Sequence, residues 1–242
     1  MPLNPKEDAT YHGRYGKCTD VTEGKHVVLV YPKVALGWDS ATAGAVVQML
    51  DRGYEALQKV WSSDPSTVFN CRVVVGYRHP SDEGGKECSA GWGWGNGQHP
   101  NWVNIPWYYI GKEEEPLRAC SHELVHPFVH IADIRGSNRH LVEGICDAFR
   151  GTVAERMGLT TYGSNEVARM FDESAKGLAN LSPHGQQYQH VAACVLAFAG
   201  ATRGTTPTVQ QLARVVTSLN DNPDFYKVAL PCPWLEQMLN SR

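Results

Sequence analysis

The distribution of apolar residues changes close to residue 116 of this chain. Before that point, β-branched apolar residues come in short runs, at His26 to Tyr31 (HVVLVY) and Cys71 to Tyr77 (CRVVVGY), which are typical of buried strands. After it, apolar residues recur three and four positions apart over most of the chain, as in amphipathic helices. Strands followed by helices predict an α+β fold.

Three further features complete the expected order of elements. The apolar spacing from Ser40 to Trp61 predicts a helix between the two strands, with Ser40 as its N-cap. The aromatic segment at 101–110 is interrupted by Pro106, which predicts a strand at an edge of the sheet. Later helices are expected at 116–126, 141–157, 165–176, 186–199, 209–219 and 233–239.

Composition and charge exclude several classes of protein. Hydrophobic residues make up 42% and charged residues 19% of the 242 residues, which is typical of a globular chain. The formal net charge of -3 argues against nucleic acid or an anionic membrane as a partner. No apolar stretch reaches the roughly 20 residues that a membrane span requires. We expect one domain over 1–242, with a mixed-sheet lobe at 1–115 and a mainly helical lobe at 116–242.

The seven cysteines do not form a metal-binding pattern of their own. None of them belongs to a CxxC pair, which excludes a zinc ribbon. Disulfides would suit a secreted protein, whereas Cys146 and Cys194 lie in apolar helical surroundings that suit buried thiols. Asn180 opens a glycosylation sequon that is compatible with secretion.

Residues 122–126 carry the pattern HExxH. Residues four apart in a helix share a face, so His122 and His126 can bind one zinc ion. Glu123 lies about 100° further round the helix and can hold a metal-bound water, which makes it the candidate general base. Pro127 disfavours helical geometry at the preceding residue, so the helix is expected to end or kink at His126.

A catalytic zinc needs a third protein ligand, and Glu143 is the first candidate. It opens the expected second helix, and Asp147 shares its face and could accept a hydrogen bond from a ligating histidine. Gly144 would let the helices approach closely. The alternative third ligands are Asp133, His130 and His140.

HExxH followed by ExxxD on a second helix resembles the pattern of the gluzincin metallopeptidases. Residues 141–150 (LVEGICDAFR) are also similar to the stretch L-[IV]-E-G-I-A-D-[YF]-V-R of the basic secretory protein family of zinc peptidases. The resemblance covers roughly residues 101–198 and is strongest at these two motifs. Cys146 stands where that family has a small apolar residue, and we expect it to be a core thiol and not a ligand.

The resemblance implies a zincin-like fold and a role for each matching residue. His122, His126 and Glu143 would be the zinc ligands, Glu123 the catalytic base and Asp147 the partner of a ligating histidine. Tyr188 falls where related proteins have a tyrosine that could stabilise an oxyanion, with His184 and His190 as alternatives.

The resemblance also implies that a peptide substrate aligns along the edge strand before the HExxH helix. Here that strand would bring Trp102, Asn104 and Trp107 to the substrate. The Gly-Trp-Gly-Trp-Gly loop at 91–95 could stack against a sugar, so glycoproteins are further candidate substrates.

The expected function is that of a zinc-dependent endopeptidase acting on proteins or peptides. Zinc would lower the pKa of a bound water, and Glu123 would accept its proton and pass it to the leaving amine. Two alternatives stay open: a zinc-containing module that binds peptide or glycan without turnover, and a zinc hydrolase acting on a non-peptide amide. The family resemblance favours a secreted protein whose signal peptide has been removed.

Overall fold

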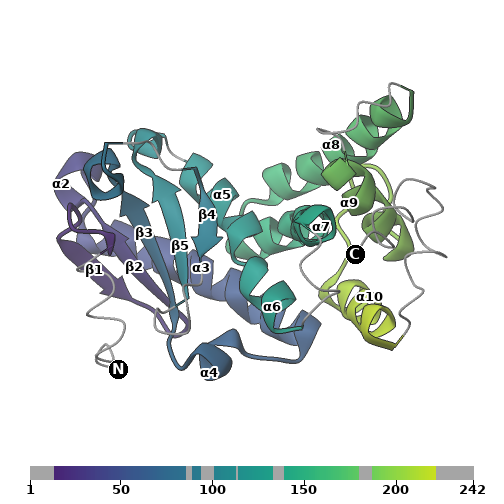
Figure 1. Ribbon diagram of the computed structural model, residues 1–242, viewed down its shortest axis with the longest axis horizontal. Coiled ribbons are helices and arrows are strands. Elements are labelled where there is room, and N and C mark those ends of the chain that lie inside the picture. The colour runs from purple at the N-terminus through teal and green to yellow at the C-terminus, as the bar shows by residue number, and fades with distance from the viewer. Residues whose placement is uncertain are drawn as a thin grey trace.

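The computed structural model describes residues 14–85, 89–93, 101–112, 114–132, 139–179 and 187–221. As expected for α+β, a mixed five-stranded sheet comes first and the remainder is mostly helical. Figure 1 shows the sheet at one end of the molecule, helices α8, α9 and α10 at the other, and α5 and α7 between them. The helix expected at 233–239 and the sequon at Asn180 lie outside the described residues.

Three parallel strands form the centre of the sheet, and their valines build its core. These are β2 (Val27–Tyr31), β3 (Val73–Arg78) and β5 (Trp102–Pro106), and most of their residues are buried. The antiparallel strands β1 (Asp20–Glu23) and β4 (Gly91–Gly93) complete the order β1-β2-β3-β5-β4. Strands buried on both faces read as continuous apolar runs, which is why β2 and β3 were visible in the sequence.

The prediction that 101–110 is an edge strand is wrong. Within the described sheet, β5 pairs with β3 on one side and with β4 on the other, and β4 is the edge. Pro106 is the last residue of β5, where its missing N–H removes no bond from the middle of the ladder. The segment continues as a 3-10 turn, η2, at Trp107–Tyr109.

Helix α3 (Ser40–Trp61) has the expected bounds, but its N-cap is Asp39 and not Ser40. The Asp39 carboxylate accepts a hydrogen bond from the backbone N–H of Thr42, as an N-cap side chain does. The buried face of α3 contacts both the sheet and α7. The short helices α2 (Lys33–Leu36), α4 (Pro65–Phe69) and η1 (Pro80–Glu83) occupy connections in the sheet-rich part.

Helix α7 is the central element of the helical part. It contacts α3, α5, α6, α8 and α9, and Leu141, Ile145 and Phe149 on its inner face are fully buried. None of the described helices is both long and apolar enough to cross a membrane. The helices of this part are α5 (Glu115–Glu123), α6 (His126–Ile131), α7 (Arg139–Met157), α8 (Thr160–Ala179), α9 (Gln187–Phe198) and α10 (Val209–Asp221).

A close helix approach occurs at Gly144, but it is between α7 and α9 and not between α7 and the HExxH helix as predicted. A Cβ added to Gly144 would lie 2.5 Å from Cβ of Val191 and 3.0 Å from the backbone oxygen of Tyr188. We therefore expect Gly144→Ala to lower the free energy of unfolding by about 1–3 kcal/mol through overpacking. Urea denaturation followed by circular dichroism measures this change.

The matched control is Gly44→Ala in α3, where an added Cβ meets no atom within 4 Å. Alanine has the higher helix propensity, so this variant should be up to about 1 kcal/mol more stable than the original chain. A loss of stability at position 44 equal to that at 144 would contradict the close packing of α7 on α9.

Candidate metal centre

The HExxH segment spans a break between two helices. α5 ends at Glu123 and α6 begins at His126, while Leu124 and Val125 keep helical backbone angles (φ -66° and -76°). Pro127 stands in the first turn of α6, where its missing N–H is tolerated. The expected interruption is therefore present. The first helix ends three residues earlier than predicted, and a second helix continues from His126.

Three donor atoms from this segment and from α7 converge on one point. Nε2 of His122 lies 3.2 Å from Nε2 of His126 and 3.1 Å from Oε2 of Glu143. The same Glu143 oxygen lies 3.7 Å from Nε2 of His126. Ligands bound to zinc at about 2.0–2.1 Å with tetrahedral angles are about 3.3 Å apart, so this triangle has the dimensions of a metal site.

The sulfur of Cys146 is a further possible ligand atom near the two imidazoles. Its Sγ and one nitrogen each of His122 and His126 all lie within 4.8 Å of one another, so these three residues could hold a metal ion. Cys146 is fully buried. Burial and the neighbouring carboxylates raise the pKa of its thiol well above the ordinary value, so in the metal-free protein the thiol is neutral.

Asp147 fixes the orientation of His122. Oδ1 of Asp147 lies 2.8 Å from Nδ1 of His122, and since a carboxylate can only accept, Nδ1–H is the donor. This leaves Nε2 as the nitrogen that faces His126 and Glu143. Asp147 is itself held by Arg150, whose Nη1 lies 3.2 Å from Oδ1.

The pKa values of the two histidines are shifted in opposite directions. Burial alone would lower the pKa of His122, but hydrogen bonds with Asp147 and Glu143 raise it to about 9. Burial, together with the charge on His122, lowers the pKa of His126 to about 4. The carboxylates around His122 therefore favour its protonated form, whereas His126 is neutral.

Glu123 lies beside the two histidines and is 7% exposed. Its Oε2 is 3.6 Å from Nε2 of His126, and burial raises the pKa of its carboxyl. The backbone N–H of Trp92 donates to this carboxylate. A buried carboxylate with a raised pKa, next to a candidate metal position, has the properties required of a general base.

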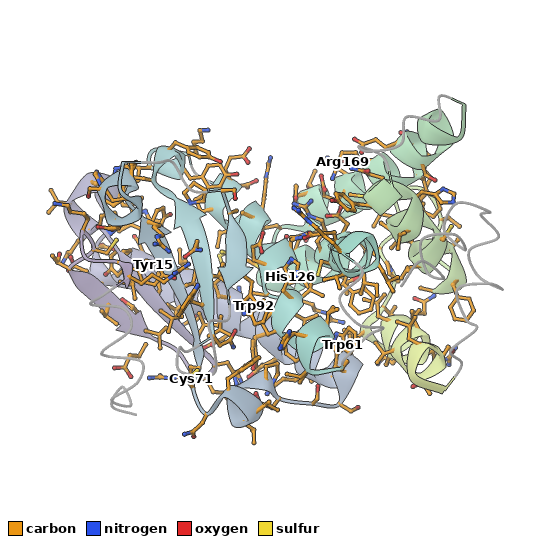
Figure 2. All side chains as sticks on the ribbon, viewed as in Figure 1. Tyr15, Trp61, Cys71, Trp92, His126 and Arg169 are labelled. Carbon is orange, nitrogen blue, oxygen red and sulfur yellow. The ribbon has the colours of Figure 1, made fainter. Side chains whose placement is uncertain are left out.

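Trp92 is a site residue that sequence reasoning missed. Its ring stacks parallel to that of His126, with centroids 6.3 Å apart and an interplanar angle of 5°. Figure 2 shows the two side chains next to each other where the sheet meets the helices. The ring also packs against His130, and its indole N–H donates to the side chain of Asn101. The sequence predicted a loop at 91–95 that could stack against a sugar, whereas Gly91–Gly93 form strand β4 and place Trp92 against His126.

The structure pairs the expected substrate-strand residues with other parts of the sheet lobe. The guanidinium of Arg14 lies 3.9 Å from the ring centroid of Trp102, and its Nε donates to the side chain of Asn104 at 3.0 Å. The ring of Trp107 packs edge-on against His79.

The remaining candidates are on α9 or outside the described residues. Tyr188 stands at the start of α9, where its backbone oxygen faces Gly144. His190 lies on the same helix with Nδ1 2.9 Å from the hydroxyl of Ser174. Asp133, His184 and the side chain of His140 lie outside the part of the chain that the structure describes.

A cavity of about 420 Å³ opens beside His122 and Glu123. Its walls include Arg118 of α5, Arg150 of α7, and Arg169 of α8. Sequence reasoning did not find it, because residues from three helices form most of it and no local spacing connects them.

Comparison with family models, curated proteins and solved structures gives no match for this chain. The function of the protein is therefore inferred from the geometry of the candidate metal centre and from the two sequence motifs, HExxH and the stretch at 141–150.

The role of Asp147 is tested by Asp147→Asn. Loss of the charged partner of His122 should weaken the binding of Zn²⁺ and Co²⁺ by 10–100-fold, the typical cost of removing such a partner. Competition titration against a chromogenic chelator measures the affinity. Asp172→Asn is the control, because Asp172 makes an equally short ion pair with Arg203 (2.7 Å) on the protein surface. Equal affinity of both variants would exclude the assigned role of Asp147.

Proposed function

We propose that this protein is a zinc-dependent metallopeptidase that hydrolyses peptide bonds within proteins. The observation that carries the proposal is the triangle of His122 Nε2, His126 Nε2 and Glu143 Oε2, with the buried carboxylate of Glu123 beside it. A set of two imidazoles and one carboxylate with an adjacent acid suits hydrolysis assisted by a metal ion.

Zinc is the metal that this donor set suits best. Zn²⁺ favours four-coordinate sites with nitrogen and carboxylate ligands, and three protein ligands leave the fourth position open. When bound, zinc polarises a carbonyl group and lowers the pKa of its water. Glu123 would then accept a proton from the water whose oxygen adds to the carbonyl carbon, and would pass it to the amine nitrogen as the C–N bond breaks, while Asp147 would keep His122 in the ligating tautomer.

Glu143 is a better third ligand than Cys146. Its carboxylate oxygen lies 3.1 and 3.7 Å from the two imidazole nitrogens, close to the separation expected in a tetrahedral site. Burial would raise the pKa of Glu143, but the hydrogen bond with His122 and the nearby charges lower it, so the carboxylate is ionised. The Cys146 thiol would have to lose a proton before it could bind.

Strand β4 is the proposed docking strand for the peptide. It is the edge of the described sheet, so an extended peptide can add to it through backbone hydrogen bonds. The ring of Trp92 on this strand stacks on His126, which would bring such a peptide close to the candidate metal site. Tyr188 stays the proposed oxyanion donor. A zincin-like fold, membership of the gluzincins and a secreted location are further parts of the proposal, supported by the two motifs.

Single substitutions should separate the candidate ligands. Glu143→Ala should lose zinc and activity, whereas Cys146→Ala and Asp133→Ala should bind one zinc ion per chain, as measured by elemental analysis. The Co²⁺ derivative should lack the charge-transfer absorption of a thiolate ligand, because nitrogen and oxygen atoms alone contact the metal. Loss of zinc from Cys146→Ala with retention in Glu143→Ala would reassign the third ligand to Cys146.

The activity itself is tested by digestion of an unfolded protein and of a mucin-type glycoprotein. Zinc-loaded wild type should produce new termini, read by mass spectrometry, and Glu123→Gln should retain zinc but cleave about 10²–10⁴-fold more slowly. A wild type that holds zinc and cleaves neither substrate would contradict the proposal. Binding of peptide or glycan without turnover would then favour a binding module, and hydrolysis of small acyl amides would favour a non-peptide amidase.

A further inference from the structure

The cavity beside the proposed base determines which substrate group can lie next to the reacting bond. His122 and Glu123 form part of its wall, and so does Ala90, which directly precedes β4. A peptide paired with β4 would therefore pass this cavity. Its volume of about 420 Å³ has room for an amino-acid side chain.

Charged groups dominate the walls, which makes an apolar side chain a poor occupant. Three arginines, Arg118, Arg150 and Arg169, line the cavity together with several carboxylates. An apolar group would remove these charges from water without offering a hydrogen bond in return. The occupant is therefore expected to be a polar or charged group.

Three of the four carboxylates of the wall have arginine partners, and the fourth is Glu123, the proposed base. Oδ1 of Asp147 is shared by His122 and Arg150, and both oxygens of Glu166 accept from Arg169. Glu115 lies 3.5 Å from Arg118. A lysine entering the cavity would meet three carboxylates that are already compensated and three guanidinium groups of its own charge.

Donor capacity toward an occupant of the cavity, in contrast, is left over on Arg150. Within the described residues, Arg150 contacts carboxylates through Nη1 alone, which lies 3.2 Å from Asp147 and 3.3 Å from Glu166. Nε of Arg150 and Nε of Arg118 are buried, and no described group accepts from them. Both guanidinium groups pack on the ring of Tyr162, at 4.8 Å for Arg118 and 5.8 Å for Arg150, which holds them on one side of the cavity.

We propose that this cavity is a specificity pocket for a carboxylate of the substrate, the side chain of an aspartate or glutamate next to the cleaved bond. This inference rests on the proposed function. Arg150 is the anchor, since no described group accepts from its Nη2, which can donate to a carboxylate while Nη1 remains on Asp147 and Glu166. Arg118 lies four residues before His122 on α5 and supplies a second positive charge. Arg169 is a wall residue whose three nitrogens are taken by Glu166 and Glu173.

Arg118 is the residue to change, because it can be replaced without disturbing the metal site. Its carboxylate partners are Glu114 and Glu115, and none of its described ion pairs involves Asp147, Glu143 or a histidine. Arg150, in contrast, also supports Asp147, so its loss would affect the orientation of His122 as well.

The test uses one peptide sequence in which a single position near the cleaved bond carries Glu, Gln, Leu or Lys. For zinc-loaded wild type, kcat/KM should be at least tenfold higher with Glu than with Gln, and lowest with Lys. Arg118→Leu should remove most of the preference, and Arg118→Glu should make Lys the better substrate. Arg203→Glu is the control for net charge, since Arg203 pairs with Asp172 on the surface and does not line the cavity.

A binding measurement separates this inference from the proposed function. Fluorescence anisotropy of the same labelled peptides on zinc-loaded Glu123→Gln reports the pocket without turnover. Tighter binding of the Glu peptide that Arg118→Glu reverses supports the pocket, even if wild type cleaves no peptide and the peptidase proposal fails. Cleavage or binding that does not distinguish Glu from Gln overturns the pocket and leaves the peptidase proposal standing.

Discussion

The hydrogen bond between His122 and Asp147 is the contact on which the rest of the candidate site depends. It joins α5 to α7 at 2.8 Å, and it sets which nitrogen of His122 faces the other donors. Asp147 is fixed in turn by Arg150, which also contacts Glu166, and Glu166 is held by Arg169 of α8. A series of ion pairs and hydrogen bonds therefore joins α5, α7 and α8. A shift of any of these helices would misplace the imidazole of His122.

The buried acids around His122 need a compensating positive charge, and the proton on this histidine supplies it. Glu123, Glu143 and Asp147 lie around His122, and the last two keep lowered pKa values because that histidine carries a proton. The position of Cys146 near the same site has a different cause, which is the packing of α7. It lies one turn of α7 after Glu143, in the fully buried interface, where burial keeps its thiol neutral.

Local spacing predicted the elements that depend on local chemistry. The buried runs of β2 and β3, the bounds of α3 and the pairing of Glu143 with Asp147 all come from residues near each other in the sequence, and the structure brings Glu143 to the two histidines. The edge strand was assigned to the wrong segment because Pro106 was taken as a property of the whole strand, whereas it affects only the last position.

The parts that the sequence could not predict are those that long-range pairing creates. Three residues with two glycines form β4 only because β5 offers them a partner, and Trp92 reaches His126 and Glu123 only through that pairing.

The arginine-lined cavity has the same origin and a further consequence. Arg150 both supports Asp147 and lines the cavity, so in the proposed site the orientation of a metal ligand and the choice of substrate would share one side chain. Arg118 carries only the second of these roles. Substitutions of Arg118 are therefore expected to change specificity alone. A substitution of Arg150 would alter both the metal site and the choice of substrate.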